Sequence, residues 1–231
     1  MMRIHSGCSC IDGNLDEGIA PETITLIYGS PETGKSTLAM QFSANCANQG
    51  FKVLFVDCDN SFSPKRLSQI SGDKFEEIAE RIILIRPKNF QEQMFVVDHI
   101  QDYTNEKIGL IVFDTLTSLY GAKVCETSNK PYELNRELNR QLAILAQTVK
   151  IKKIPMIMTS QVRCILDDQN ENVRPVATRV LKFWANNIIA LKPTEFPQTI
   201  KVLFENKNND IPEALCYVQI GESGIQDTQF P

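Results

Sequence analysis

Apolar residues along the first two-thirds of the chain alternate between two patterns. One is a short, continuous apolar run, typical of a strand covered on both faces, as in a parallel sheet. The other spaces apolar side chains three or four residues apart, which predicts an amphipathic helix. The predicted strands are 24–28, 52–59, 82–85, 108–114 and 155–161, and the predicted helices are 35–49, 65–80 with a break near Gly72, 90–103 and 134–153. This alternation predicts an α/β fold with a mostly parallel, doubly wound sheet flanked by helices.

After residue 161 the pattern changes, because strand-like runs predominate there. We expect these runs to form an antiparallel C-terminal extension of the sheet. Residues 1–22 form a polar, turn-rich lead-in, and residues 163–175 are polar and charged, which predicts a flexible loop. With no internal repeat and no interdomain linker, residues 1–231 are expected to form one domain. The strand-like runs are 187–191, 199–204 and 215–220.

Residues 29–36 read Gly-Ser-Pro-Glu-Thr-Gly-Lys-Ser and fit G-x-x-x-x-G-K-[ST], the phosphate-binding loop of nucleotide hydrolases. A predicted strand precedes the loop and a predicted helix follows it, so backbone N–H groups can point at phosphate oxygens. An incidental Gly-Lys-Ser in a glycine-rich turn is the alternative, and both flanks argue against it. The pattern therefore predicts binding of a nucleoside triphosphate. The residues expected to bind it are Gly29, Ser30, Pro31, Glu32, Thr33, Gly34, Lys35, Ser36 and Thr37.

Particular residue types in this loop have particular tasks. Gly29 and Gly34 permit backbone angles that a side chain would disfavour. Lys35 would place a cation near the β- and γ-phosphates, and the Ser36 hydroxyl would be a ligand of Mg²⁺. A second acidic position should then follow a neighbouring buried strand, and Asp114, directly after the run 108–113, fits this requirement.

The composition is that of an ordinary globular protein, with 42% hydrophobic and 8% aromatic residues in a chain of 231. No apolar run approaches the ~20 residues that a membrane helix requires. The N-terminus lacks the apolar core and cleavage site of a secretory signal, so we expect a cytoplasmic protein without a membrane partner. The seven cysteines include no C-x-x-C pair, and the two histidines are far apart. We therefore expect reduced thiols and no metal site built from these residues.

Charge is unevenly distributed along the chain. The formal net charge is −4, which argues against a protein that coats nucleic acid unspecifically. Residues 129–182, however, carry ten Lys/Arg against five Asp/Glu, so this segment is +5 and the remainder is −9. Such asymmetry indicates either a surface that faces a polyanion or a solvated helix face that is basic without binding one.

Hydrolysis needs a group that positions or deprotonates the attacking water. Asp57 and Asp59 stand at the end of the second predicted strand, and both could instead be acids that cap a loop. Gln161, also at a strand end, could sense the γ-phosphate through its amide.

Several motifs occur in a specific order. The phosphate loop is followed by Phe-Val-Asp-Cys-Asp at 55–59, Phe-Ser-Pro-Lys-Arg-Leu at 62–67, Phe-Asp-Thr-Leu-Thr-Ser-Leu at 113–119 and Thr-Ser-Gln-Val at 159–162. Together with the opening at 6–12 and the closing segment at 212–227, this order resembles the ATPase core of RecA-type recombinases, specifically their archaeal branch. The resemblance covers nearly the whole chain and implies a RecA-like P-loop NTPase fold that binds ATP and Mg²⁺.

The resemblance also implies roles for individual residues. Arg66 matches the arginine that stacks on adenine in that branch, although a solvated helix arginine is an equal alternative. Gln161 matches the glutamine that senses the γ-phosphate, and two DNA-binding loops would fall near 121–130 and 162–176. Two positions depart from the family. Asp59 stands where most members have glutamate, so we expect weak ATPase activity, and Ser160 stands where asparagine is usual.

Only 28 residues precede Gly29, so the helical DNA-binding domain and polymerisation linker of longer family members are expected to be missing. We therefore predict a core-only family member, an ATP- and DNA-binding accessory protein of homologous recombination and DNA repair. It would assist or regulate the main recombinase or other repair proteins as a monomer or small homo-oligomer. A nucleotide-dependent regulatory module that contacts only protein is the alternative, and a degenerate paralogue that binds nucleotide poorly is a third.

Overall fold

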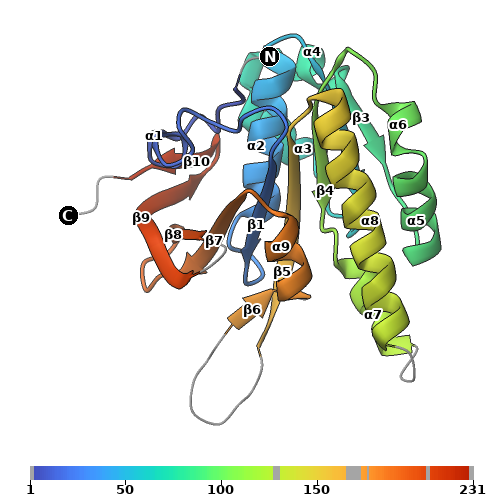
Figure 1. Ribbon diagram of the computed structural model, residues 1–231. Helices are drawn as coiled ribbons and strands as arrows, with labels where there is room; N and C mark the ends of the chain where they lie inside the picture. Colours follow the sequence, from blue (N-terminus) through green and yellow to red (C-terminus); the bar gives the residue numbers. More distant parts are fainter. Residues whose placement is uncertain (1–2, 127–130, 165–172, 176, 207–208, 229–231) are drawn as a thin grey trace.

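The protein is described by a computed structural model in which residues 3–126, 131–164, 173–175, 177–206 and 209–228 are placed. Its strands form one mixed sheet with the order β10-β9-β8-β7-β1-β5-β4-β2-β3, and β6 pairs with β5 beside this path. Helices cover both faces of the sheet (Figure 1). The strands are β1 (Ile24–Gly29), β2 (Lys52–Asp57), β3 (Ile82–Ile85), β4 (Ile108–Asp114), β5 (Met156–Cys164), β6 (Val173–Pro175), β7 (Asn187–Pro193), β8 (Thr199–Asn206), β9 (Asn209–Gly221) and β10 (Gly224–Asp227).

The pairing of the strands confirms the predicted sheet. Strands β3, β2, β4, β5, β1 and β7 are paired in parallel, and β7 to β10 continue the sheet in antiparallel pairs. Since parallel neighbours end at the same edge, the sheet has a carboxyl edge and an amino edge in its parallel part. The helices are α1 (Ser9–Gly13), α2 (Lys35–Asn48), α3 (Pro64–Ser71), α4 (Phe75–Ala79), α5 (Phe90–Asp98), α6 (Ile100–Tyr103), α7 (Ser118–Glu126), α8 (Pro131–Lys152) and α9 (Thr178–Trp184).

Each face of the sheet has its own hydrophobic core. Successive strand residues point to opposite faces, so Leu26 of β1 packs with α5, α8 and α9, and Ile27 packs with α2 and the N-terminal lead-in. All six residues of β1 and all seven of β4 are buried. This double burial is the reason that these strands are continuously apolar rather than alternating.

Three elements were missed because their signals are short. The lead-in forms α1 and an antiparallel bridge between Ile4 and Ile19, and Cys8 and Ile11 are buried in the core on the α2 side. Helix α9 lies between predicted strands, and β10 has only four residues. The segments are stable here because they bury apolar side chains against long elements, which local propensity does not report.

The two segments expected to be loops are partly regular. Helix α7 includes residues 121–126, and residues 127–130 lie outside the described chain. Strand β5 runs past Gln161 to Cys164 and pairs antiparallel with β6, with Arg163 opposite Arg174. The ends of the segment 163–175 therefore form a two-stranded ribbon, while residues 165–172 lie outside the described chain.

The lead-in is fastened to the C-terminal hairpin. The thiols of Cys10 and Cys216 are joined as a disulfide, with Cα atoms 6.3 Å apart, which differs from the expectation that all thiols are reduced. The Asp227 carboxylate accepts hydrogen bonds from the backbone N–H groups of Ser9 and Cys10 at 2.8 and 2.9 Å and from the Cys8 thiol at 3.1 Å. Burial acts to raise the pKa of Asp227, but these hydrogen bonds outweigh it and lower that pKa to about 2.

None of the described helices is both long enough and apolar enough to cross a membrane.

The Asp227 contacts predict a pH-dependent stability difference. Hydrogen bonds to a charged acceptor contribute about 1.5–3 kcal/mol when buried, and we reduce this to about 1 kcal/mol because Asp227 is exposed. For Asp227→Asn we therefore expect the Tm near neutral pH to fall by about 2–4 °C.

The pH dependence of this stability difference follows from the lowered pKa of Asp227. The stabilising contribution of Asp227 is fully present above the carboxyl's unfolded pKa of about 3.9 and is lost as the pH falls through about 2. The Tm difference between the parent and Asp227→Asn should thus be constant from neutral pH to about 5 and close below that. Thermal melts across this range measure it, with the exposed Glu195→Gln as the control. A difference that persists unchanged in acid would contradict the assignment.

Candidate functional site

The phosphate-loop residues lie between the end of β1 and the start of α2, at the carboxyl edge of the sheet. Gly34 has a left-handed backbone with φ 86° and directly precedes α2. At Gly29 a Cβ atom would collide with the Leu191 carbonyl oxygen and would lie 2.6 Å from Thr33 Oγ1, so only glycine fits. The predicted strand–loop–helix geometry is therefore present, with the N-terminal N–H groups of α2 facing the loop.

Lys35 is held inside the loop rather than in solvent. Lys35 is only 7% exposed, and its Nζ donates a hydrogen bond to the Ser30 carbonyl oxygen at 2.7 Å. Burial lowers the pKa of Lys35, whereas the nearby carboxylates of Asp114 and Asp59 act to raise it. A buried ammonium group at the mouth of an N–H-lined loop is complementary to phosphate oxygens.

Asp114 ends β4 and is completely buried. Its Oδ1 accepts a hydrogen bond of 2.5 Å from Thr159 Oγ1, whereas Oδ2 has no hydrogen-bond partner among the described residues. Burial raises the pKa of Asp114, whereas the Thr159 hydroxyl and the nearby Ser36 hydroxyl, which does not reach hydrogen-bond geometry with Oδ2, act to lower it. A buried carboxylate oxygen without a donor is costly unless a cation occupies the remaining position. The oxygen ligands that Mg²⁺ prefers are thus present in Ser36 and Asp114.

The structure separates the two acids that follow β2. Asp57 is buried and caps the adjacent loop: its carboxylate accepts hydrogen bonds from the N–H groups of Ser61 and Phe62 and pairs with Arg86 at 3.1 Å. Asp59 is only partly buried and accepts a hydrogen bond from Thr115 Oγ1 at 2.8 Å. Asp57 is therefore the loop-capping acid, and Asp59 is the acid that remains near Lys35.

Gln161 and Arg66 lie on different sides of the loop. Gln161 is opposite Gly29 in the β1–β5 register and is exposed. The Arg66 guanidinium instead donates hydrogen bonds to the carbonyl oxygens of Gly221 and Glu222 at 2.9 and 2.8 Å, in the turn between β9 and β10. The arginine thus holds that turn in place, a contact that the sequence did not indicate.

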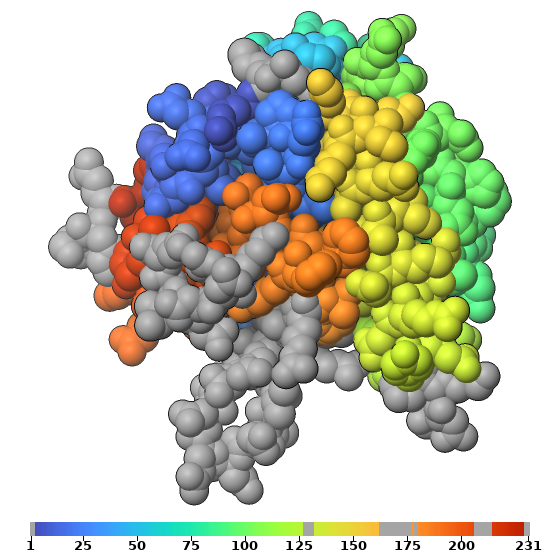
Figure 2. Space-filling model, in the orientation of Figure 1, coloured from blue at the N-terminus to red at the C-terminus, as the bar shows by residue number. Residues whose placement is uncertain are grey.

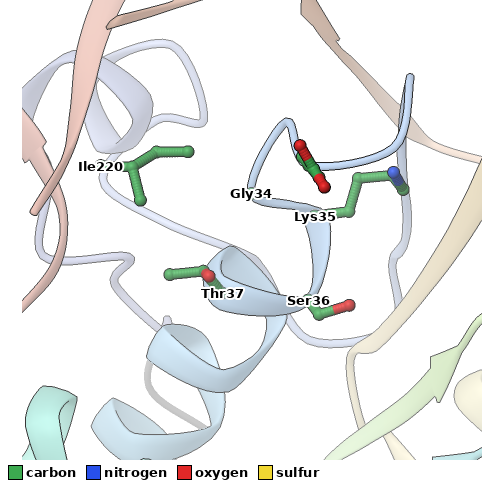
Figure 3. Close-up of a pocket in the computed structure, with 6 residues that line it drawn as sticks. Gly34, Lys35, Ser36, Thr37 and Ile220 are labelled. Carbon is green, nitrogen blue, oxygen red and sulfur yellow. The ribbon is translucent and has the colours of Figure 1, made fainter. Parts of the chain in front are cut away.

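A pocket of about 220 Å³ is lined by Glu32, Gly34, Lys35, Ser36, Thr37 and Ile220. Figure 3 shows that Thr37 points toward Ile220, while Lys35 and Ser36 point to the other side of the start of α2. Ile220 therefore forms an apolar wall beside the polar loop. The hairpin that carries it is attached to α2 by Gln41, whose side-chain amide bonds both the N–H and the carbonyl of Ile225.

Sequence reasoning found the polar half of this site and missed its apolar wall and its supports. Ile220 lies in a predicted strand far along the chain, and only tertiary packing brings it to the loop. Thr115 directly follows β4, and Thr159 lies within β5, two residues before Gln161. Hydroxyl groups near the candidate site residues could have been considered as partners of the acids.

Comparison with known proteins identifies the family. The Rad51 family model matches residues 1–228. The chain belongs to the Rad51 family. The RadB proteins of Thermococcus kodakarensis and Methanococcus maripaludis, each named "DNA repair and recombination protein RadB", are both 32% identical to it. The first match covers 98% of this chain and 100% of the relative, and the second covers 80% and 81%.

A solved structure described as the RadB recombinase is 31% identical, covers 98% of this chain and 100% of its own, and superposes with a TM-score of 0.82. These findings confirm both the RecA-like fold and the resemblance to the archaeal branch of the recombinases. ATP and Mg²⁺ are the ligands generally used by this Rad51-family fold.

For this Rad51-family chain, the basic segment 129–182 is not one surface. Helix α8 runs from the carboxyl edge to the amino edge of the sheet, so Lys150, Lys152 and Lys153 lie at the end opposite the β5–β6 ribbon (Figure 1). Arg140 is bound by Asp98 and Glu137 at 2.7 and 2.8 Å. Charge that is contiguous in sequence is therefore divided in space, because a helix of 22 residues spans ~33 Å.

Proposed function

We propose that this protein binds Mg-ATP at residues 29–37 and binds DNA as an accessory factor of homologous recombination and DNA repair. The observation that carries the proposal is the buried Lys35 beside an Asp114 carboxylate oxygen that lacks a donor among the described residues. The names of the RadB relatives support the role in recombination and repair. Cooperation with the main recombinase is part of the same proposal.

Each residue of the site would have a distinct task. The loop N–H groups and Lys35 would bind the phosphate chain, and Lys35 would exchange its bond to the Ser30 carbonyl for one to a phosphate oxygen. Ser36 and Asp114 would hold Mg²⁺, which when bound neutralises charge on the phosphate oxygens. Ile220 and Arg66 would border the nucleoside, with stacking of Arg66 on the base requiring release of its bonds to the β9–β10 turn.

Asp59 would orient or deprotonate the attacking water, and the Thr115 hydroxyl would hold its carboxylate. Aspartate is one methylene shorter than the family's usual glutamate, and misplacement by about 1 Å can lower a rate on the order of 10²-fold. We therefore propose weak hydrolysis in which bound ATP changes conformation more than it supplies energy.

DNA binding is proposed at the carboxyl edge of the sheet. Gln161, opposite Gly29 of the phosphate loop, leads directly into the β5–β6 ribbon that carries Arg163 and Arg174. A change in how Gln161 contacts the γ-phosphate could thus be passed along β5 to the ribbon. A regulatory module that contacts only protein is the second candidate, favoured by the net charge of −4.

The proposed role of Asp59 predicts slow and mutable turnover. Asp59→Ala should lower Mg-ATP hydrolysis to the background rate, and Asp59→Glu should raise it by about ten- to a hundredfold, since the carboxylate then reaches farther. Steady-state phosphate release measures both, with Asp73→Ala as the exposed-carboxylate control. Unchanged turnover in Asp59→Ala, or parent turnover near that of full-length recombinases, would refute this role.

DNA binding predicts a salt-dependent affinity for labelled single-stranded DNA in fluorescence anisotropy. The logarithm of the affinity should fall linearly with that of salt concentration, and Arg163→Ala/Arg174→Ala should make the slope shallower by about one or more. Arg140→Ala is the control, because carboxylates already bind that guanidinium. No binding at low salt with Mg-ATP present would support the protein-only module instead.

A further inference from the structure

Cations occupy the amino edge of four neighbouring strands, opposite the candidate nucleotide site. In sheet order β5-β4-β2-β3, they are Lys153 shortly before β5, Lys107 directly before β4, Lys52 at the first position of β2 and Arg81 directly before β3. Lys150 and Lys152 at the end of α8 extend the group. We call these six residues the amino-edge ridge.

Backbone contacts place the ridge residues next to one another. The Lys52 N–H donates to the Lys107 carbonyl at 2.7 Å, and the Val53 N–H donates to the Arg81 carbonyl at 2.9 Å. Met156 of β5 is opposite Ile111 of β4, and the Ile111 N–H donates to the Pro155 carbonyl at 3.1 Å, so the start of β5 lies beside β4. With strands ~4.8 Å apart, four of them span ~14 Å, comparable to two or three phosphates along a DNA strand.

The charges on the ridge are available. Lys107, Lys150, Lys152 and Lys153 are exposed, and none of the six cations makes an ion pair with a carboxylate among the described residues. The Arg81 guanidinium donates one hydrogen bond to the Gly50 carbonyl. Acids also stand in the segments that precede these strands, namely Glu76, Glu77 and Glu80 before β3, Asp102 and Glu106 before β4, and Glu22 before β1. The ridge cations are therefore interspersed with acids, but none of them is held in an ion pair with these acids among the described residues.

Helix-end electrostatics explain only part of this arrangement. Lys150 and Lys152 would favour the C-terminal dipole of α8 wherever that helix ended. Lys52, Arg81 and Lys107 follow the C-terminal ends of α2, α4 and α6 but lie beyond their last helical residues, and the dipole effect falls off within the last turn. A line of cations on adjacent strands fits the regular spacing of a phosphate backbone.

We propose that the amino-edge ridge is a second DNA-binding surface that contacts the phosphate backbone of duplex DNA. The inference rests on the proposed function, to which it adds a surface separate from the β5–β6 ribbon. Since the ridge shares no residue with the phosphate loop and lies at the other edge of the sheet, Mg-ATP should not change its contribution. The protein would then hold two DNA segments, one at each edge.

The test is anisotropy with a short labelled duplex across a range of salt concentrations, with and without Mg-ATP. For Lys107→Ala/Lys150→Ala/Lys152→Ala we expect a salt slope shallower by about two to three and at least a tenfold loss of affinity at low salt. The matched control is Lys65→Ala/Lys88→Ala/Lys192→Ala, which removes three exposed lysines outside the ridge. All six are surface positions, so circular dichroism melts should match the parent protein.

The outcomes separate this inference from the proposed function. A ridge variant that binds like the parent, or like the control variant, would overturn the ridge alone. The ridge would also be overturned if adding Mg-ATP abolished the difference in DNA affinity between the ridge variant and the parent. A parent protein that binds no DNA at low salt would overturn both the ridge and the proposed DNA-binding role.

Discussion

The proximity of buried Lys35 to the Asp114 and Asp59 carboxylates is the interaction on which the candidate site depends. Removing an ammonium and a carboxylate from water is expensive unless each gains partners. Here the partners come from residues within or directly after the strands: Ser30 follows β1 and binds Lys35, Thr159 of β5 binds Asp114, and Thr115 follows β4 and binds Asp59. The parallel sheet therefore has two roles in the site. It buries the charged groups, and it brings the carboxyl ends of β1, β4 and β5 to one edge. The Asp114 oxygen that stays unpaired among the described residues is what a phosphate-bound cation would satisfy.

Continuous apolar runs predicted the parallel strands, because strands covered on both faces have no polar side to reveal a period. The phosphate loop and Asp114 followed from local patterns that chemistry imposes within a few residues. Ile220, Arg66 and Gln41 could not be assigned in the same way. Their contacts join β9 and β10 to α2 and α3, more than 150 residues away. Helices α1 and α9 were also missed, because such short segments are stabilised by burial against distant elements rather than by local propensity.

Charge along the sequence was a poor guide to charge in space. The basic segment 129–182 includes a 22-residue helix, so its cations lie at opposite edges of the sheet. Figure 2 shows α8 as a long yellow surface strip beside the orange surface of α9, reaching toward the upper edge of the molecule in this view. The proposals for the two edges follow this division: DNA contact linked to the nucleotide at the β5–β6 ribbon, and DNA contact independent of the nucleotide at the amino-edge ridge. An acidic chain can still bind DNA when its cations are collected in this manner.

The central claim is that Lys35 and the surrounding loop form a Mg-ATP site. Isothermal titration calorimetry of the intact chain with Mg-ATP tests it most directly, with Lys35→Ala as the variant and Lys65→Ala as the exposed-lysine control. We predict saturable binding at one site for the parent and the control, and at least a hundredfold weaker binding for Lys35→Ala, about 2.7 kcal/mol. Parent protein that binds no Mg-ATP, or Lys35→Ala that binds as tightly as the parent, would contradict the account.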